Sequence, residues 1–274
     1  MRLLSSSLLL LAGSAAARRQ IPAHGCTAVD GSAVANSGKS VGTEVVYNNI
    51  TLYVSKPDES VRKARTGAAV LYLTDVFGIQ LLENRLLADS FARAGYLVVA
   101  PDLFNGAPAP SDLNAPGFDT GAFLGLHGPA ATDPIIAAAV AYVQATAGGT
   151  AQAPVRIGAT GYCFGGRYAF RTAAAGRGAV AAFAAHPSLL EDGEILGVKG
   201  PASVAAAEND SMMPPARRAA IEALLLNSTQ PYQVALYSGT SHGFGVRANV
   251  SNPIEKFAKE SAYLQAVRWF DNFL

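Results

Sequence analysis

The chain has 274 residues, of which half are hydrophobic and only 15% are charged, and its formal net charge is +1. One α/β domain can reach this length without dividing, and the apolar content excludes a disordered chain. Lysine and arginine form no run longer than a pair, so the charge pattern gives no indication of a nucleic-acid partner. The composition therefore predicts one compact domain with a single core.

The first residues have the layout of a secretory signal peptide. A basic residue precedes an apolar stretch from Leu3 to Leu11, and small residues follow up to Ala17. The stretch is interrupted by serines and is shorter than the ~20 residues that span a bilayer, which disfavours a membrane anchor. We therefore expect cleavage near Ala17, secretion and no stable membrane association, with an N-terminal extension at residues 18–42 and a domain at residues 43–274.

Three Asn-x-Ser/Thr sequons fit this secretory route, at Asn49, Asn227 and Asn249. A fourth sequon, at Asn209, overlaps the candidate site described below. We expect the first three to be glycosylated and the fourth to be unmodified.

Only two cysteines are present, Cys26 and Cys163, so at most one disulfide can form and the core must hold the fold. A bridge between them remains a structural alternative. Cys163, however, lies in a motif that would point its sulfur into a site, which favours a free thiol.

Strand and helix signals alternate along most of the chain. Two β-rich runs come first and predict an antiparallel pair, at Thr43 to Tyr47 and Ile50 to Val54. Later strands are expected at Ala68 to Leu73, Tyr96 to Ala100, Val155 to Ala159, Ala179 to Ala184, Pro201 to Ala206 and Tyr232 to Tyr237. Helices are expected at Leu81 to Ala94, Asp133 to Ala145, Phe164 to Ala175, Pro214 to Leu226 and Pro253 to Leu274.

This alternation predicts the α/β class, with a mostly parallel central sheet and helices on both faces. Ligands in such folds bind at the carboxyl ends of the strands, so functional residues are expected in the loops there. The segment from Asn105 to Thr132 holds four prolines and shows no clear element. A connection of this length is typical of a lid or a binding loop, although a surface excursion without a role fits it equally well.

The most informative motif is Gly161-Tyr162-Cys163-Phe164-Gly165-Gly166, which lies between an expected strand and an expected helix. This is the arrangement of a nucleophile elbow with cysteine in place of serine. Its glycines leave room for a sharp turn that strains the central residue, and the following helix amino terminus favours a thiolate. The alternative is a buried structural cysteine beside glycines that permit close packing.

An elbow nucleophile in this class requires an acid and then a histidine later in the chain. Asp210 follows the apolar run of an expected strand, although it could instead be the N-cap of the next helix. His242 follows the last expected strand in a glycine-flanked loop, where a solvent-exposed histidine is the alternative. The other three histidines, His24, His127 and His186, do not have the required order and place.

A second candidate elbow, Gly239-Thr240-Ser241-His242-Gly243, formally matches the serine motif. No helical pattern follows it, and no loop histidine remains downstream to act as a base. We therefore reject Ser241 as the nucleophile.

Four motifs in chain order resemble successive signatures of the dienelactone hydrolase family. They are Leu73-Thr74-Asp75-Val76-Phe77-Gly78-Ile79, Val99-Ala100-Pro101-Asp102-Leu103-Phe104, the cysteine elbow and His242-Gly243-Phe244. The resemblance runs from about Thr43 to the carboxyl end. It implies an α/β-hydrolase fold, a Cys163-Asp210-His242 triad, and no metal or organic cofactor. The secretory signal and the stretch Ala185-His186-Pro187-Ser188 resemble fungal members.

The same resemblance places an oxyanion hole at the backbone N–H groups of Val76 and Phe164, where this fold provides such donors. Asp75, Arg247 and His186 would support the substrate or the site. Bacterial members carry a glutamate in place of Asp75, close to the thiol. The shorter Asp75 would reach less far, and a second role in fixing the oxyanion loop fits it.

Bacterial members also bind the substrate carboxylate with two arginines. Here Arg247 lies five residues after His242 instead of four, and the segment from Asn105 to Thr132 has no arginine. This departure puts recognition of a carboxylated dienelactone in doubt.

The sequence therefore predicts a hydrolase, active as a monomer or small homo-oligomer, that cleaves a small-molecule ester or lactone. Its Cys163 thiolate would form a thioester that water then hydrolyses with His242 as base. Aromatic catabolism and secondary metabolism both fit such chemistry. The competing hypotheses are a serine-type esterase of the same fold, disfavoured by the elbow cysteine, and a non-catalytic protein that binds a small ligand.

Overall fold

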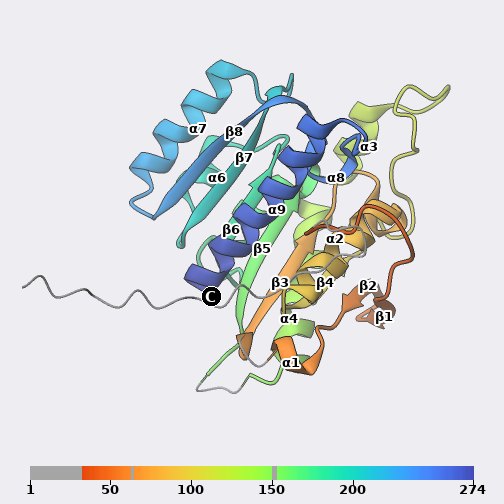
Figure 1. Ribbon diagram of the computed structural model, residues 1–274, viewed down its shortest axis with the longest axis vertical. Helices are drawn as coiled ribbons and strands as arrows, with labels where there is room; N and C mark the ends of the chain where they lie inside the picture. Colours follow the sequence, from red (N-terminus) through yellow and green to blue (C-terminus); the bar gives the residue numbers. More distant parts are fainter. Residues whose placement is uncertain (1–32, 63–64, 150–152) are drawn as a thin grey trace, which may run out of the picture.

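The computed structural model describes residues 33–62, 65–149 and 153–274, so the expected signal peptide and Cys26 lie outside the described residues. Its centre is an eight-stranded sheet in the order β1-β2-β4-β3-β5-β6-β7-β8 (Figure 1). Pairing is antiparallel from β1 to β4 and parallel from there to β8. The strands are β1 (Thr43–Tyr47), β2 (Ile50–Ser55), β3 (Ala68–Leu73), β4 (Leu97–Pro101), β5 (Arg156–Tyr162), β6 (Ala179–Ala185), β7 (Ala202–Asn209) and β8 (Tyr232–Ser241).

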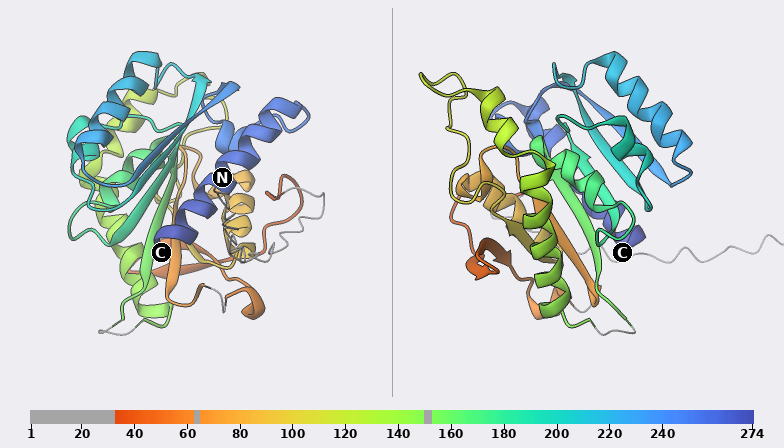
Figure 2. Two further views of the ribbon diagram at one scale, coloured as in Figure 1. Left: turned by 60° about the vertical axis from the view of Figure 1, so that its left-hand side comes forward. Right: turned by 180° about the vertical axis from the view of Figure 1, so that it is seen from behind.

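Helices cover both faces of this sheet, which confirms the predicted α/β-hydrolase fold (Figure 2). One face carries α2 (Leu82–Arg93), α8 (Phe244–Arg247) and α9 (Pro253–Phe273). The other face carries α4 (Pro129–Thr146), α5 (Phe164–Thr172), α6 (Asp192–Leu196) and α7 (Pro215–Asn227). Three further elements lie in connections, namely α1 (Glu59–Arg62), the 3₁₀ turn Gly78–Gln80 and α3 (Thr120–Leu126).

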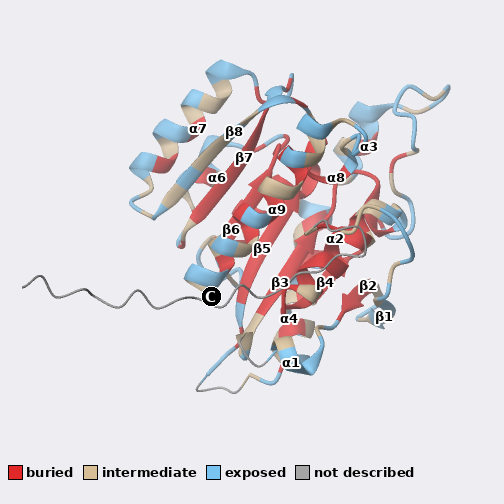
Figure 3. Ribbon diagram, viewed as in Figure 1, coloured by how far each residue is buried: buried red, intermediate tan, exposed pale blue. Residues whose placement is uncertain are grey.

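The central strands are buried along almost their whole length, whereas the edge strand β8 is largely accessible (Figure 3). Continuous apolar runs such as Ala-Ala-Val-Leu-Tyr-Leu in β3 are expected where helices exclude water from both faces. The buried strands provide a rigid support whose carboxyl ends all point to one edge. That edge carries the candidate residues Cys163, Asp210 and His242.

The segment from Asn105 to Thr132 is more ordered than the sequence indicated. It contains α3, whose N-cap Asp119 accepts a hydrogen bond from the backbone N–H of Ala122 at 3.0 Å. It also contains the start of α4, at Pro129 instead of the expected Asp133, with the proline in the favoured first helical position. The sequence did not predict α3, because the helix is short, contains two glycines and shows no clear helical spacing of apolar residues.

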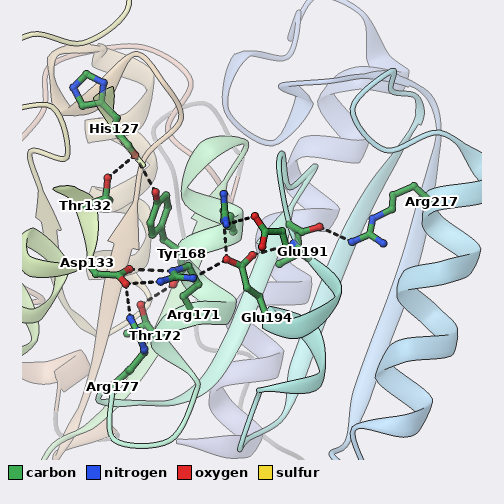
Figure 4. Close-up of polar contacts among 12 residues, drawn as sticks. His127, Thr132, Asp133, Tyr168, Arg171, Thr172, Arg177, Glu191, Glu194 and Arg217 are labelled. Carbon is green, nitrogen blue, oxygen red and sulfur yellow. Dashed lines mark hydrogen bonds and ion pairs between the residues drawn. The ribbon is translucent and has the colours of Figure 1, made fainter. Parts of the chain in front are cut away.

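Ion pairs attach α5 to its neighbours on the side of the sheet where α4 and α6 lie (Figure 4). The guanidinium of Arg171 binds Asp133 of α4, with an Nε to Oδ1 distance of 3.0 Å, and Glu194 of α6 at 2.8 Å. Arg177 shares Asp133, at 2.7 Å. Single exposed pairs contribute only about 0–1 kcal/mol, but a shared network fixes the position of a helix more firmly. Because the nucleophile elbow begins α5, this network also supports the site.

Residues 33–42, the described part of the expected N-terminal extension, pack against the domain. Val34 is fully buried in the core. The backbone N–H of Ala35 donates to Ser90 at 3.1 Å, and that of Val41 donates to Asp89 at 2.8 Å, both on α2. In the described part of the chain, no helix is both long and apolar enough to cross a membrane.

Candidate active site

The elbow motif has the strained backbone that its glycines predicted. Cys163 has a φ of 51° and a ψ of −114°, a conformation that is costly for any residue with a side chain. A Cβ on Gly161 would lie 2.1 Å from the Gly165 carbonyl oxygen, and one on Gly165 would lie 2.1 Å from the Leu73 carbonyl oxygen. Glycine is therefore required at both positions because α5 approaches β3 and β5 this closely.

Cys163 carries a free thiol at the amino terminus of α5, and its exposed fraction is 7%. Its backbone N–H donates to the carbonyl of Ala185 at 3.1 Å, and its own carbonyl accepts from Ser188 at 3.0 Å. These two bonds join the elbow to the segment that follows β6. The thiol is consequently held at the carboxyl end of the sheet, beside the loops that carry the other candidate residues.

The predicted acid and base lie together at the ends of the neighbouring strands β7 and β8. The Nδ1 atom of His242 lies 3.0 and 2.9 Å from the two carboxylate oxygens of Asp210. Asp210 also accepts the backbone N–H of Met212 at 2.9 Å, and its side chain is fully buried. β8 extends to Ser241, four residues beyond its expected end, so His242 is placed directly by the strand instead of by a flexible loop.

Ser188 contacts both the nucleophile and the base, a position that the sequence did not reveal. Its Oγ lies 3.3 Å from the Sγ of Cys163 and 3.3 Å from the Nε2 of His242. The only sequence signal was its presence in a stretch that resembles fungal family members. Cys163, Ser188, His242 and Asp210 thus form one continuous line of polar contacts.

The protonated form of His242 is strongly favoured in this line. Burial is the largest single effect and lowers the pKa of His242, but direct hydrogen bonds to Asp210 and Cys163, with the charges of both groups, together outweigh it and raise the pKa to about 10. At neutral pH the imidazole therefore carries a second proton.

Val76 and Phe164, whose backbone N–H groups were predicted to form an oxyanion hole, both line the cavity beside the thiol. Neither backbone N–H donates a hydrogen bond to another described residue. Phe164 is the first residue of α5, where N–H groups have no partner within the helix. The backbone N–H of Gly165 donates to the carbonyl of Thr74 at 3.0 Å and holds the two loops together. This arrangement leaves two donors free for an anionic oxygen.

Asp75 is fully buried in the loop after β3, directly before Val76. Its carboxylate accepts several hydrogen bonds. It accepts hydrogen bonds from the Phe77 backbone at 3.2 Å, from the Asn84 amide at 2.8 Å and from Nε of Arg247 at 3.1 Å. Burial raises the pKa of Asp75, although Asn84 and Arg247 oppose this shift. No hydrogen bond links Asp75 to Cys163 in the described structure. Its contacts instead fix the loop after β3, which carries Val76, and orient Arg247.

His186 lies directly beside His242, with ring centroids 5.0 Å apart in an edge-to-face arrangement. It is fully buried, and neither ring nitrogen has a hydrogen-bond partner among the described residues. Burial, together with repulsion from His242 and Arg247, lowers the pKa of His186 well below its ordinary value. His186 is therefore a neutral ring that packs behind the candidate base.

A cavity of about 140 Å³ opens onto the thiol, and its walls are mainly apolar. α3 and the segments around it form one wall, where Phe123 packs against Phe104 and His127. Among the described residues of the lining, only Arg247 has a permanent charge, and its Nε is bonded to Asp75. The lining comprises Val76, Ala109, Leu113, Phe118, Thr120, Phe123, Leu124, Cys163, Phe164, Ser188, Leu189, Met212, His242 and Arg247.

The serine of the rejected motif and the four sequon asparagines are not among the residues that line the cavity. Ser241 ends β8 and is exposed, and the single turn of α8 follows it. The asparagines at 49, 209, 227 and 249 are all exposed. Glycosylation at Asn49, Asn227 and Asn249 stays a prediction.

Comparison with known proteins identifies the family of this chain. A model of the dienelactone hydrolase family matches residues 50–274. Hydrolase pyvD from Aspergillus violaceofuscus is 38% identical over 239 residues, which cover 87% of this chain and 93% of that protein. Hydrolase tropI from Talaromyces stipitatus is 37% identical over 248 residues, with the same two coverages. The crystal structure of dienelactone hydrolase from Anabaena variabilis covers 85% of this chain and 97% of its own, with a TM-score of 0.59 and 15% identity, which shows a shared fold.

Proposed function

The chain belongs to the dienelactone hydrolase family and is an ester or lactone hydrolase, and we propose that it acts through a triad of Cys163, His242 and Asp210. The observation that carries this proposal is the line of contacts from the thiol to the Asp210 carboxylate at the mouth of an apolar cavity. A strained elbow, a base held by a buried acid and two free backbone donors are the parts that acyl transfer requires.

In the first half of the proposed cycle, the Cys163 thiolate attacks the carbonyl carbon of a bound ester or lactone. A sulfur–carbon bond forms, and the carbonyl electron pair moves to the oxygen, which the N–H groups of Val76 and Phe164 stabilise. When the carbonyl re-forms, the carbon–oxygen bond to the alkoxide breaks. The alkoxide takes the proton from Nε2 of His242, so the products are a thioester and a neutral imidazole.

The second half of the cycle needs His242 to accept a proton from water. Acylation converts the charged sulfur into a neutral thioester, which removes one of the two partners that raise the pKa of His242. Burial then acts against the protonated form, so the ring is able to act as a base. Asp210 keeps Nε2 directed at the site throughout. The surroundings of His242 thus allow it to act as an acid in the first half-reaction and as a base in the second.

The walls of the cavity favour a small substrate with an apolar or aromatic body. The volume of about 140 Å³ suits a ring of modest size, and the phenylalanines of the α3 wall provide apolar contact. The charge of Arg247 is partly neutralised by Asp75. We therefore propose neutral lactones and esters ahead of dicarboxylated ones, in aromatic catabolism or secondary metabolism.

We also propose that the protein reaches the secretory route through its first 17 residues and acts as a monomer or small homo-oligomer. Expression of the full chain in a eukaryotic host would test this. Secretion with an amino terminus near Arg18 is expected, and retention in the cell would contradict it.

Hydrolysis of a small activated ester tests the proposed chemistry. Wild-type protein should turn over the ester, whereas Cys163→Ala should lose at least about 10³-fold in kcat. Treatment of wild type with iodoacetamide should have a similar effect. Circular dichroism would confirm that the variant is folded. Unchanged turnover in Cys163→Ala would remove Cys163 as the nucleophile, and a wild type that binds but never hydrolyses esters would favour a non-catalytic ligand-binding protein.

A further inference from the structure

Ser188 contacts two residues of the proposed triad without belonging to it. Its hydroxyl is 3.3 Å from both the Cys163 sulfur and the His242 Nε2 atom, and it lines the cavity. Only 5% of the residue is exposed, so water does not readily compete for these contacts. The hydroxyl is therefore positioned to influence both reacting groups at once.

The backbone around Ser188 is held in a costly conformation that maintains this position. His186 and Leu189 have φ angles of 39° and 57°, in the left-handed region that residues with side chains avoid. The backbone N–H of His186 donates to the carbonyl of Ala205 on β7 at 2.8 Å, and that of Ser188 donates to Cys163 at 3.0 Å. Strain at two positions on either side of one buried hydroxyl indicates that its placement matters.

The elbow itself is shaped to accommodate this segment. A Cβ on Gly166 would lie 2.8 Å from the Cβ of Pro187, so a larger residue there would push the segment away. Gly166 thus allows the Ser188 segment to approach the start of α5. The contact between hydroxyl and thiol results from close packing of two backbones instead of a chance rotamer of an exposed serine.

On the basis of the proposed function, we propose that Ser188 is a catalytic residue that links Cys163 and His242 through its hydroxyl. A hydroxyl has one proton to donate and lone pairs to accept. His242 is protonated at rest, so its Nε2–H donates to Oγ of Ser188, and the hydroxyl donates its own proton to the Cys163 thiolate. Both ions of the resting pair are then stabilised by one neutral group.

The same hydroxyl provides a path from the neutral pair, in which Cys163 is a thiol and His242 a neutral imidazole, to the ion pair. The proton leaving Sγ is accepted by Oγ while the hydroxyl's own proton moves to Nε2 of His242. The products are a thiolate and an imidazolium, and the hydroxyl of Ser188 is neutral before and after the transfer. No external acid, base or oxidant is needed.

The test compares Ser188→Ala with Ser188→Thr, which keeps a hydroxyl. Two quantities are measured for each: kcat and KM on an activated ester, and the rate of iodoacetamide labelling of the Cys163 peptide as a function of pH, followed by mass spectrometry. For Ser188→Ala we expect about a tenfold loss in both kcat and the labelling rate at pH 7, with KM changed less than about twofold. The pH at which labelling is half-maximal should rise, and Ser188→Thr should recover most of both losses.

Ser55→Ala is the matched control, because Ser55 is also buried but lies on β2 and its hydroxyl has no hydrogen-bond partner among the described residues. It should leave kcat and the labelling profile unchanged. If Ser188→Ala keeps the wild-type kcat and labelling profile while Cys163→Ala is inactive, the proposal for Ser188 is wrong and the proposed function stands. If Cys163→Ala keeps its turnover and Ser188→Ala loses it, Ser188 is itself the nucleophile, which overturns both proposals.

Discussion

Two histidines, which follow β6 and β8 on either side of β7, have pKa values shifted in opposite directions although their ring centroids are only 5.0 Å apart. His242 follows β8, partly faces the cavity and has its pKa raised to about 10 by Asp210 and Cys163 against the effect of burial. His186 follows β6, is fully buried without a hydrogen-bond partner among the described residues, and has its pKa lowered. The same side chain is a cation in one environment and neutral in the other.

The comparison shows that partners, and not depth of burial alone, decide the charge of an imidazole in this site. Burial disfavours the charged form of both rings, yet only His242 has a carboxylate and a thiol close enough to reverse that effect. The cation on His242 in turn disfavours a second cation at His186. A neutral ring behind the base avoids repulsion that would otherwise displace the base from its working position.

Replacement of Asp210 by asparagine should have the largest effect, because it removes the first of the partners that hold His242 protonated and oriented. We expect a loss in kcat of roughly 10² to 10⁴-fold and a lower pKa for His242. Steady-state kinetics would measure this loss. The matched control is Asp271→Asn, which removes an acid of α9 that is bonded to Arg65 away from the cavity, and it should keep kcat within about twofold of wild type. Equal losses in the two variants would mean that the effect is structural.

Replacement of His186 by phenylalanine tests whether the folded chain holds His186 neutral, and it should have a moderate effect on stability. His186 binds a proton less readily in the folded chain than in the unfolded one, so its contribution to the free energy of unfolding decreases as pH falls below about 6.5. At pH 5 this loss amounts to at most about 2 kcal/mol relative to pH 8. Urea unfolding at the two pH values should show a smaller difference for His186→Phe than for wild type. The same pH dependence in both proteins would show that His186 is not held neutral.

Much of this arrangement was predictable because it depends on local patterns. The strand and helix alternation predicted the sheet, and Gly161, Gly165 and Cys163 predicted a strained elbow that the backbone angles confirm. Chain order selected Asp210 and His242, which the structure brings within 2.9 Å of each other. These signals are readable because tight turns and strand ends restrict which residues fit.

The residues that the sequence did not reveal act through contacts between distant segments. Asn84 lies inside α2 with nothing in its helical pattern to distinguish it, yet its amide binds the carboxylate of Asp75. Ser188 reaches Cys163 only because Gly166 lets the segment after β6 approach α5. The state of His186 likewise depends on His242, which is 56 residues away in the chain. Such roles follow from packing, which periodicity and composition do not encode.

The most direct test of the resting ion pair is nitrogen NMR of the histidine rings in wild type and Cys163→Ala. At pH 8 we predict that wild-type His242 is protonated on both ring nitrogens, since its pKa is about 10, while His186 is neutral. The spectrum of His186→Phe assigns the two rings. In Cys163→Ala the pKa of His242 should fall, because the thiol is one of the groups that raise it. A neutral His242 in wild type at pH 8, or a His242 pKa that does not respond to loss of the thiol, would contradict the account of this site.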